Sequence, residues 1–208
     1  MRNLFLLGAI LMSAGHANAA VLEAVQNRDI AALEQALSAG APVDERNAQG
    51  QTALLVAVWN DDVETARLLI AAGADVNAKD RIGDSPYLVA GAHGRVEILR
   101  LVLDNGADLR STNRFGGTAL IPAAEKGHPE AVEMLIEAGV DVDHVNDLGW
   151  TALLEAVILT DGGPVAQRSV KLLLDGGADR SIPDRDGRTA LEHARAKGYR
   201  EIAAMLEE

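Results

Sequence analysis

The chain has 208 residues, of which 19 are basic and 31 are acidic, so its formal net charge is −12. An acidic surface repels the phosphates of nucleic acids and anionic membranes, so neither is expected as a partner. The absence of Cys excludes a disulfide framework, thiol catalysis and a thiolate metal site.

The first 19 residues have the features of a cleaved secretory signal. Arg2 precedes the apolar run Leu4–Met12, and the segment ends in Ala17-Asn18-Ala19, which suits a cleavage site. The apolar run is about half the 20 residues that a membrane-spanning helix needs. We therefore predict that residues 1–19 are a signal peptide and that the mature protein, from Ala20, has no membrane anchor. The expected location is the bacterial periplasm, with secretion as the second choice.

Removal of this segment would leave 18 basic and 31 acidic side chains, a net charge of −13. Two interpretations of this acidity remain open. The acidic residues either keep an exported protein soluble or form an acidic face that docks a partner, and the first interpretation is preferred.

Beyond residue 20 the sequence repeats itself. An Asn or Asp stands three residues before a Gly at five places, which are separated by steps of 33, 33, 33 and 38 residues. The five pairs are Asn47/Gly50, Asp80/Gly83, Asn113/Gly116, Asn146/Gly149 and Asp184/Gly187. The same steps separate Thr52, Ser85, Thr118, Thr151 and Thr189, and also Gly40, Gly73, Gly106, Gly139 and Gly177. A fixed period in this range indicates stacked supersecondary units.

Each unit contains the residues for two helices and a loop. Thr52 can cap a first helix that begins with the small and apolar residues after it. Leu68–Ile70 supplies the apolar face of a second helix, and Gly73 suits the left-handed position at its C-terminal end. The following residues, 73–80, are rich in turn formers and predict an extended loop or hairpin.

These motifs resemble the ankyrin repeat family, whose units have about 33 residues, a turn, two antiparallel helices and a Thr-Pro-Leu-His motif. The match covers nearly everything after residue 20. Only Ser85-Pro86 keeps the Pro of this motif, because Ala follows the Thr in the other units. The resemblance implies an all-α solenoid with loop or β-hairpin fingers that binds other proteins.

The period divides the mature chain into two caps and four full repeats. The predicted boundaries are an N-terminal cap at 20–46, repeats at 47–79, 80–112, 113–145 and 146–183, and a C-terminal cap at 184–208. The N-terminal cap carries polar residues that would face water where an internal unit would face a neighbour. They are Glu23, Gln26, Asn27, Arg28, Asp29, Glu34 and Gln35.

Two irregularities interrupt the pattern. The five extra residues of the last full repeat fall within 158–167, where Gly162, Gly163 and Pro164 predict an enlarged loop. This loop is either a partner-specific protrusion or a tolerated surface insertion. Pro122 would be the fourth residue of a helix capped by Thr118, where its missing N–H removes the first helical hydrogen bond. A slight distortion of that turn is expected.

No catalytic or metal site stands out. His93, His128, His144 and His193 show no i, i+4 pair of the kind that binds zinc on a helix. Residues 184–187 match a calcium loop only in part and lack its distal Glu. The sequence offers no nucleophile with a paired acid and base. We therefore expect no enzyme activity, no metal and no cofactor.

The resemblance places partner contacts at the loop tips and at the end of each first helix, which together form a concave surface. Aromatic and large aliphatic residues gather at these positions, although stacking of the units does not require them there, and they resemble the anchors of protein interfaces. The predicted partner-binding residues are Gln49, Trp59, Asn60, Arg81, Ile82, His93, Arg114, Phe115, Lys126, Leu148 and Trp150.

The sequence thus predicts a monomeric, non-catalytic scaffold or adaptor that binds a partner protein through its concave face. One alternative is a binder of a peptide, a cell-wall fragment or a small ligand. Self-association also remains open, and a hydrolytic enzyme is the least favoured alternative.

Overall fold

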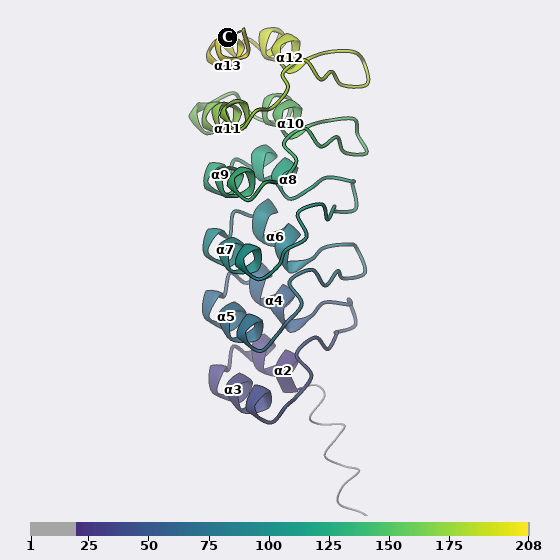
Figure 1. Cartoon of the computed structure of the whole chain (residues 1–208), viewed down its shortest axis with the longest axis vertical. Coiled ribbons are helices and arrows are strands. Elements are labelled where there is room, and N and C mark those ends of the chain that lie inside the picture. The colour runs from purple at the N-terminus through teal and green to yellow at the C-terminus, as the bar shows by residue number, and fades with distance from the viewer. Residues whose placement is uncertain (1–19, 208) are drawn as a thin grey trace, which may run out of the picture.

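The computed structural model describes residues 20–207, so the predicted signal segment 1–19 lies outside the described residues. Within this range the chain forms helices in consecutive antiparallel pairs, stacked in two columns (Figure 1). The first helices of the pairs are α2 (Ala20–Asn27), α4 (Ala53–Trp59), α6 (Pro86–Ala92), α8 (Leu120–Glu125), α10 (Ala152–Ile158) and α12 (Ala190–Lys197). The second helices are α3 (Ile30–Ser38), α5 (Val63–Ala71), α7 (Val96–Asp104), α9 (Pro129–Glu137), α11 (Pro164–Asp175) and α13 (Arg200–Glu207). Residues 20–207 contain no β-strand, so the prediction of an all-α solenoid is confirmed.

The periodic Thr or Ser fixes the start of most first helices. Its side-chain oxygen accepts a hydrogen bond from the backbone N–H three residues later, as in the 3.3 Å bond from Leu55 to Thr52. This bond satisfies one of the N–H groups that have no partner inside the helix. Ser85, Thr151 and Thr189 cap α6, α10 and α12 in the same way.

The exception is α8, where Pro122 interrupts this capping. The chain enters the helix at Ala119, already in a helical conformation, and the Thr118 hydroxyl is buried without a partner among the described residues. Because Pro122 has no N–H, the carbonyl of Thr118 accepts instead from Ile121, at 3.3 Å. The expected distortion is confirmed, and it shortens α8 to six residues.

The periodic Asn or Asp builds the fingers that project beside the first helices (Figure 1). In one finger, the side-chain oxygen of Asn113 accepts hydrogen bonds from the N–H groups of Phe115 and Gly117, at 2.8 and 3.1 Å. Gly116 lies between them at φ 71°, a left-handed conformation that suits Gly. Asn47, Asp80, Asn146 and Asp184 accept the same pair of bonds in their own fingers.

Adjacent fingers are also bonded to each other. The N–H of Asp147 donates to the carbonyl of Phe115 at 2.9 Å, and the ring Nε2 of His144 lies 2.6 Å from the carbonyl oxygen of Gly116. The fingers therefore form a connected edge whose tips hold a regular spacing.

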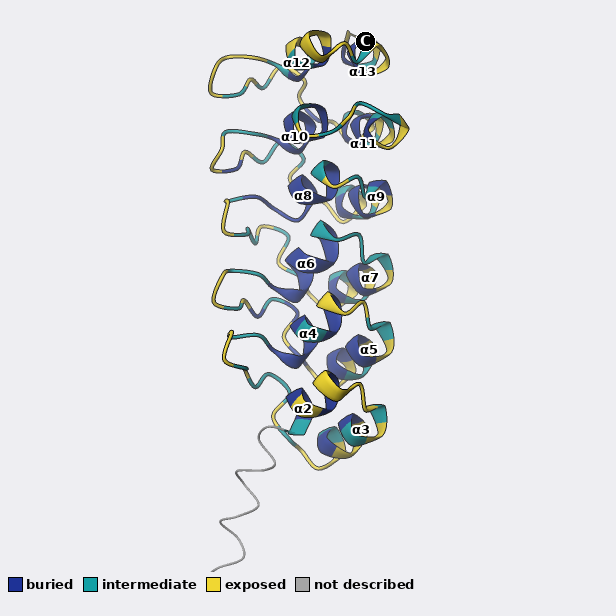
Figure 2. Ribbon diagram, turned by 180° about the vertical axis from the view of Figure 1, so that it is seen from behind, coloured by how far each residue is buried: buried dark blue, intermediate teal, exposed yellow. Residues whose placement is uncertain are grey.

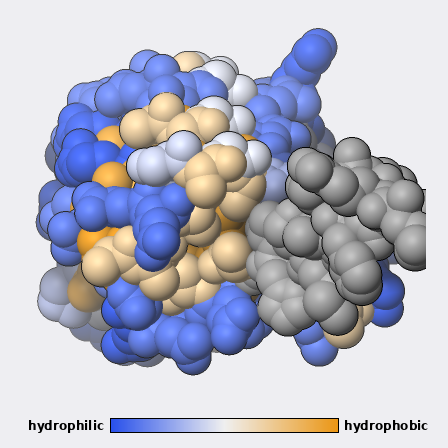
Figure 3. Space-filling view, turned by 90° about the horizontal axis from the view of Figure 1, so that it is seen from below, coloured by the Kyte–Doolittle hydropathy of each residue, from blue (hydrophilic) through white to orange (hydrophobic). Residues whose placement is uncertain are grey.

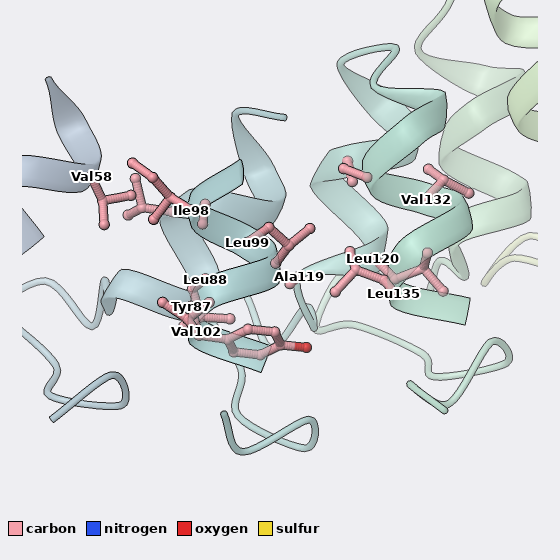
Figure 4. Close-up of a cluster of buried hydrophobic side chains, with 14 of the residues drawn as sticks. Val58, Tyr87, Leu88, Ile98, Leu99, Val102, Ala119, Leu120, Val132 and Leu135 are labelled. Atoms are coloured by element: carbon pink, nitrogen blue, oxygen red, sulfur yellow. The ribbon is translucent and has the colours of Figure 1, made fainter. Parts of the chain in front are cut away.

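The core lies between the two columns and between successive pairs (Figure 2). Gly91 allows a close approach here, since a Cβ atom on it would lie 2.8 Å from the Cβ of Ala119. Figure 4 shows a stretch of this core in which side chains from successive units pack together. Its labelled residues are Val58, Tyr87, Leu88, Ile98, Leu99, Val102, Ala119, Leu120, Val132 and Leu135.

Both ends of the array are more polar than its interior. All seven polar residues expected to face water in the N-terminal cap are exposed. Figure 3 looks onto this end, where hydrophilic residues surround a paler, weakly hydrophobic area. At the other end, α12 and α13 bury Ala190, Ala194, Ile202 and Leu206 against the last full repeat.

The five inserted residues are shared between the loop that connects α10 to α11 and the helix α11 itself. Five residues, 159–163, connect α10 to α11, whereas three residues, 60–62, connect α4 to α5. The other three inserted residues extend the second helix, because α11 has 12 residues and α9 has nine. The expectation of a loop reaching to residue 167 is therefore wrong, because Pro164 is well suited to the first turn of a helix.

The shorter loop is held against the C-terminal cap. The hydroxyl of Tyr199 donates a 2.7 Å hydrogen bond to the carbonyl of Thr160. The Tyr199 ring lies directly over Gly162, where an added Cβ atom would come within 2.5 Å of it. The insertion is thus packed rather than projecting freely, and it bonds the last full repeat to the cap.

Replacing Tyr199 by Phe is expected to lower the free energy of unfolding by about 1 kcal/mol, because a half-buried carbonyl loses its donor. Urea unfolding measures the loss, and amide hydrogen exchange should quicken in α12 and α13. Glu201→Gln, at an exposed position of α13, serves as the control with a change below about 0.5 kcal/mol. Unchanged exchange in Tyr199→Phe would contradict a role for this bond in holding the cap.

Candidate concave binding site

The apolar residues predicted for partner binding form a row along the finger tips. Ile82, Phe115 and Leu148 occupy equivalent positions of three successive fingers, and their exposed fractions are 55, 51 and 49%. Each finger turns so that its Asn or Asp accepts the N–H of this residue, which directs the side chain outward from the turn. The repeat period therefore lines up large apolar side chains on one edge of the solenoid.

A first hollow lies between these fingers and the ends of the first helices. Its volume is about 300 Å³. It brings together five of the predicted residues, which are Trp59, His93, Arg114, Phe115 and Lys126. The remaining lining residues are Asp84, Leu88, Val89, Ala92, Asn113, Pro122 and Glu125.

An aromatic contact forms one end of the first hollow. The rings of Trp59 and His93 meet edge to face, with their centroids 4.8 Å apart. Burial and the nearby cations Lys126 and Arg95 lower the pKa of His93, so its imidazole is neutral at neutral pH. This end of the hollow therefore offers an uncharged aromatic surface.

Charged groups line the remainder of the first hollow. The Arg114 guanidinium lies 4.8 Å from the centre of the Phe115 ring and 3.8 Å from a carboxylate oxygen of Asp84. Burial, together with the neighbouring Asp80, raises the pKa of the Asp84 carboxyl. The hollow thus combines a cation held over an aromatic ring with a half-buried acid.

A second hollow of about 180 Å³ continues the first along the groove. The two hollows share the residues Asn113, Phe115, Pro122 and Glu125. The second is further lined by Gly117, Ile121, Asn146, Leu148, Glu155 and Leu159. Phe115 therefore stands between two adjoining depressions, and together they form one elongated groove.

Glu155 is the most unusual residue of this groove, and the sequence prediction missed it. It lies in the first turn of α10, and only 5% of its surface is exposed. The amide Nδ2 of Asn146 donates a 2.8 Å hydrogen bond to its Oε1. Burial, followed by the charge of Glu125, raises the pKa of Glu155 to about 7.

The register of the repeats contained a signal for this residue. Glu155 is equivalent to Val56, Val89 and Pro122, and, in the C-terminal cap, to His193. Val89 and Pro122 line the first hollow, so this position faces the groove in successive units. An acid at a position that Val or Pro occupies in the three preceding repeats therefore marked a change in the chemistry of the groove. The predicted contacts lie at finger tips and helix ends, and Glu155 is at neither.

The C-terminal cap contains an equivalent pair with its charges arranged differently. Asp184 takes the place of Asn146, and its Oδ2 lies 2.6 Å from the Nε2 of His193. Backbone hydrogen bonds from Arg188 and the bond with His193 lower the pKa of the Asp184 carboxyl. A polar pair thus links finger to helix in both of the last two units.

Five of the predicted residues line neither hollow. Gln49, Asn60 and Arg81 are exposed, and Ile82 continues the row of finger tips. Trp150 is half-buried and packs against the core. The structure therefore gives Trp150 a role in packing, in addition to the partner contact that the sequence predicts for it.

The described residues 20–207 include no group of three or more His, Cys, Asp or Glu side chains that could hold a metal ion. Across the same residues, no helix is both long and apolar enough to cross a membrane.

Comparison with known proteins identifies relatives that cover most of the chain. A family model described as "Ankyrin repeats (3 copies)" matches residues 21–113 and 87–166. An ankyrin repeat domain from Acinetobacter baumannii AYE is 55% identical, with a TM-score of 0.89 over 91% of this chain and 96% of that one. The ankyrin repeat protein EF0377 is 49% identical, with a TM-score of 0.89 over 91% and 97% of the two chains.

Two further relatives are more distant or match a shorter segment. The ankyrin repeat domain of Bcl-3, a member of the IkappaB family, is 30% identical, with a TM-score of 0.81 over 90% of this chain and 84% of that one. The ankyrin repeat protein YahD of Escherichia coli K12 is 48% identical over 52 residues, which is 25% of this chain and only 26% of YahD. The family model and the extended structural matches agree with the stacked helix pairs described above, and the chain belongs to the ankyrin repeat family.

Proposed function

We propose that this protein is a non-catalytic adaptor or scaffold that binds a partner protein through the groove between its fingers and first helices. Ankyrin repeats are protein–protein interaction modules. The observation that carries the proposal is the row of half-exposed Ile82, Phe115 and Leu148 beside two adjoining hollows. Aromatic and aliphatic anchors next to depressions are typical of interface hot spots.

The proposed location is the periplasm, with secretion as the second choice. The basis is the segment 1–19, in which Arg2, an apolar run and a small-residue end follow the order of an export signal. Cell fractionation followed by N-terminal sequencing tests this proposal. We expect the exported chain to begin at Ala20; an unprocessed chain that remains in the cytoplasm would contradict it.

Affinity capture from periplasmic extract tests the binding function. The mature protein is compared with a Phe115→Ala/Leu148→Ala variant, which loses two groove anchors, and with a Val145→Ala/Val165→Ala control. Val145 and Val165 are 47% and 53% exposed, and neither lines the hollows. We expect retention of the captured protein to fall at least tenfold in the first variant, because each lost anchor costs about 1 to 2 kcal/mol, and to stay unchanged in the control.

Cross-linking followed by mass spectrometry then identifies which residues of the mature protein touch the captured protein. Contacts along the fingers at Ile82, Phe115 and Leu148 are expected. Equal retention by all three proteins, with cross-links on α3, α5, α7, α9 or α11, would overturn the assignment of the binding surface to the groove.

A further inference from the structure

The second hollow contains two carboxyl groups without a cationic partner. Among residues 20–207, neither Glu125 nor Glu155 forms an ion pair with a Lys, Arg or His. Arg114, a cation of the adjoining first hollow, forms its ion pair with Asp84 instead. When both acids are ionised, the second hollow therefore has a negative charge that no ion pair among residues 20–207 balances.

Glu155 is held in place by the fold rather than free at the surface. Its Oε1 accepts the hydrogen bond from Asn146, whereas no hydrogen bond to Oε2 is present within the described part of the chain. Asn146 is itself fixed, because its side-chain oxygen accepts the N–H groups of Leu148 and Trp150 in the finger. Glu155 as a whole is only 5% exposed and lines the hollow, so its carboxyl group is oriented before any ligand arrives.

The walls around these acids are apolar. Phe115 and Leu148 line the hollow from two fingers, Ile121 and Pro122 line it from α8, and Leu159 lines it beyond the end of α10. A volume of about 180 Å³ is smaller than the roughly 300–1,000 Å³ of usual small-molecule pockets. The hollow therefore suits one long side chain with an apolar stem and a cationic end.

We infer that the second hollow receives an arginine side chain of the partner protein, with its stem against Phe115 and Leu148 and its guanidinium at Glu125 and Glu155. This assignment rests on the proposed function, since the partner supplies the arginine. Guanidinium has five N–H donors in a plane, which allows it to bond two carboxyl groups while it lies against an aromatic ring. The ring of Phe115 already accepts a guanidinium, that of Arg114, at 4.8 Å.

Nuclear magnetic resonance on the isotope-labelled mature protein tests this assignment directly. The probes are the peptides acetyl-Ala-Arg-Ala-amide and acetyl-Ala-citrulline-Ala-amide, added at pH 8 and low salt. Citrulline has nearly the shape of arginine but carries no charge. We expect the arginine peptide to shift the side-chain carboxyl ¹³C signal of Glu155 and the amide signals of Leu148 and Leu159 in a saturable manner. The citrulline peptide should bind at least tenfold more weakly.

Two variants separate the site from general electrostatic attraction. Glu155→Gln keeps the size of the side chain and is expected to weaken binding of the arginine peptide at least tenfold. Glu137→Gln removes one acid from an exposed position at the end of α9, outside the groove, and should leave the affinity unchanged. Unchanged circular dichroism and methyl spectra confirm that both variants are folded.

Several outcomes would overturn the assignment. These are no saturable shift with either peptide, equal affinity for the arginine and citrulline peptides, or an unaltered affinity for the arginine peptide in Glu155→Gln. This test is separate from that of the proposed function. Loss of capture in Phe115→Ala/Leu148→Ala with no arginine binding would refute only the arginine assignment. Arginine binding with capture that is independent of Phe115 and Leu148 would refute the proposed function.

Discussion

Replacing Leu135 by Ala is expected to lower the free energy of unfolding by about 3 kcal/mol. Leu135 is fully buried in α9, where it lies beside Leu120 of α8 (Figure 4). It also reaches α6, since its Cδ1 lies 3.4 Å from the point where a Cβ atom would lie if Gly91 had one. Removing a buried isobutyl group loses its transfer free energy and leaves a cavity that the rigid surroundings fill only in part.

The position of Leu135 makes the effect extend beyond one helix pair. In a solenoid each unit is stabilised by its neighbours, so a cavity that adjoins two units weakens the interface between them as well. Urea unfolding should therefore show a lower midpoint by circular dichroism and by the fluorescence of Trp59 and Trp150. If circular dichroism and fluorescence give different unfolding midpoints for Leu135→Ala, the array unfolds in parts rather than in one step.

An exposed position of the same helix provides the control. Glu137→Ala lies at the end of α9 and is expected to change the stability by less than about 0.5 kcal/mol. A loss below about 1 kcal/mol in Leu135→Ala would be inconsistent with the dense packing between α6, α8 and α9.

Replacing Glu155 by Gln is expected to stabilise the protein by about 2 kcal/mol at pH 8.5. In the folded protein, burial and Glu125 raise the pKa of Glu155 from its ordinary value of 4.5 to about 7. A difference of this size corresponds to about 3 kcal/mol, and solvent screening through the open hollow reduces it to about 2 kcal/mol. Gln is neutral at all pH values and can still accept the hydrogen bond from Asn146.

The pH dependence of this effect has a definite sign. Between pH 4.5 and about 7 the folded state binds the proton of Glu155 more tightly than the unfolded state. The stability that Glu155 contributes is therefore fully present below pH 4.5 and is lost as the pH rises through about 7. The stability curves of the wild type and Glu155→Gln should coincide below pH 4.5, diverge between pH 4.5 and about 7, and stay a constant distance apart above pH 7.

Urea unfolding at intervals of pH between 4.5 and 8.5 measures both curves. The exposed Glu137→Gln serves as the control, and its curve should run parallel to that of the wild type across the whole range. A constant difference between the wild type and Glu155→Gln at every pH would show that the substitution alters packing rather than the ionisation of this carboxyl group.

The two expected effects reflect opposite demands on the same scaffold. Leu135 lies where the fold needs dense packing, and its loss weakens the array. Glu155 lies where the groove would need a fixed negative charge, and its burial makes the ionised form costly. Residues that reduce stability in this way are more often found at binding sites than in the structural core.

The sequence by itself determined the architecture, because each repeated residue acts locally. Asn113 closes its finger through bonds to residues two and four positions later, and Thr52 caps its helix through a bond three positions later. Such contacts recur wherever the residues recur, so the 33-residue period was enough to predict the helix pairs and the equivalent positions of Ile82, Phe115 and Leu148 in successive units.

The tertiary structure decided what depends on contacts between units. It placed Trp150 against the core, and it held the insertion under Tyr199 of the following cap. It also buried Glu155 between Asn146 of its own finger and the hollow beside Glu125 of the preceding unit. These outcomes depend on how far neighbouring side chains exclude water and on which residues of adjacent units meet. The periodic pattern fixes the position of a residue within its unit. It does not show how deeply that residue is buried or which residues of the adjacent units it contacts.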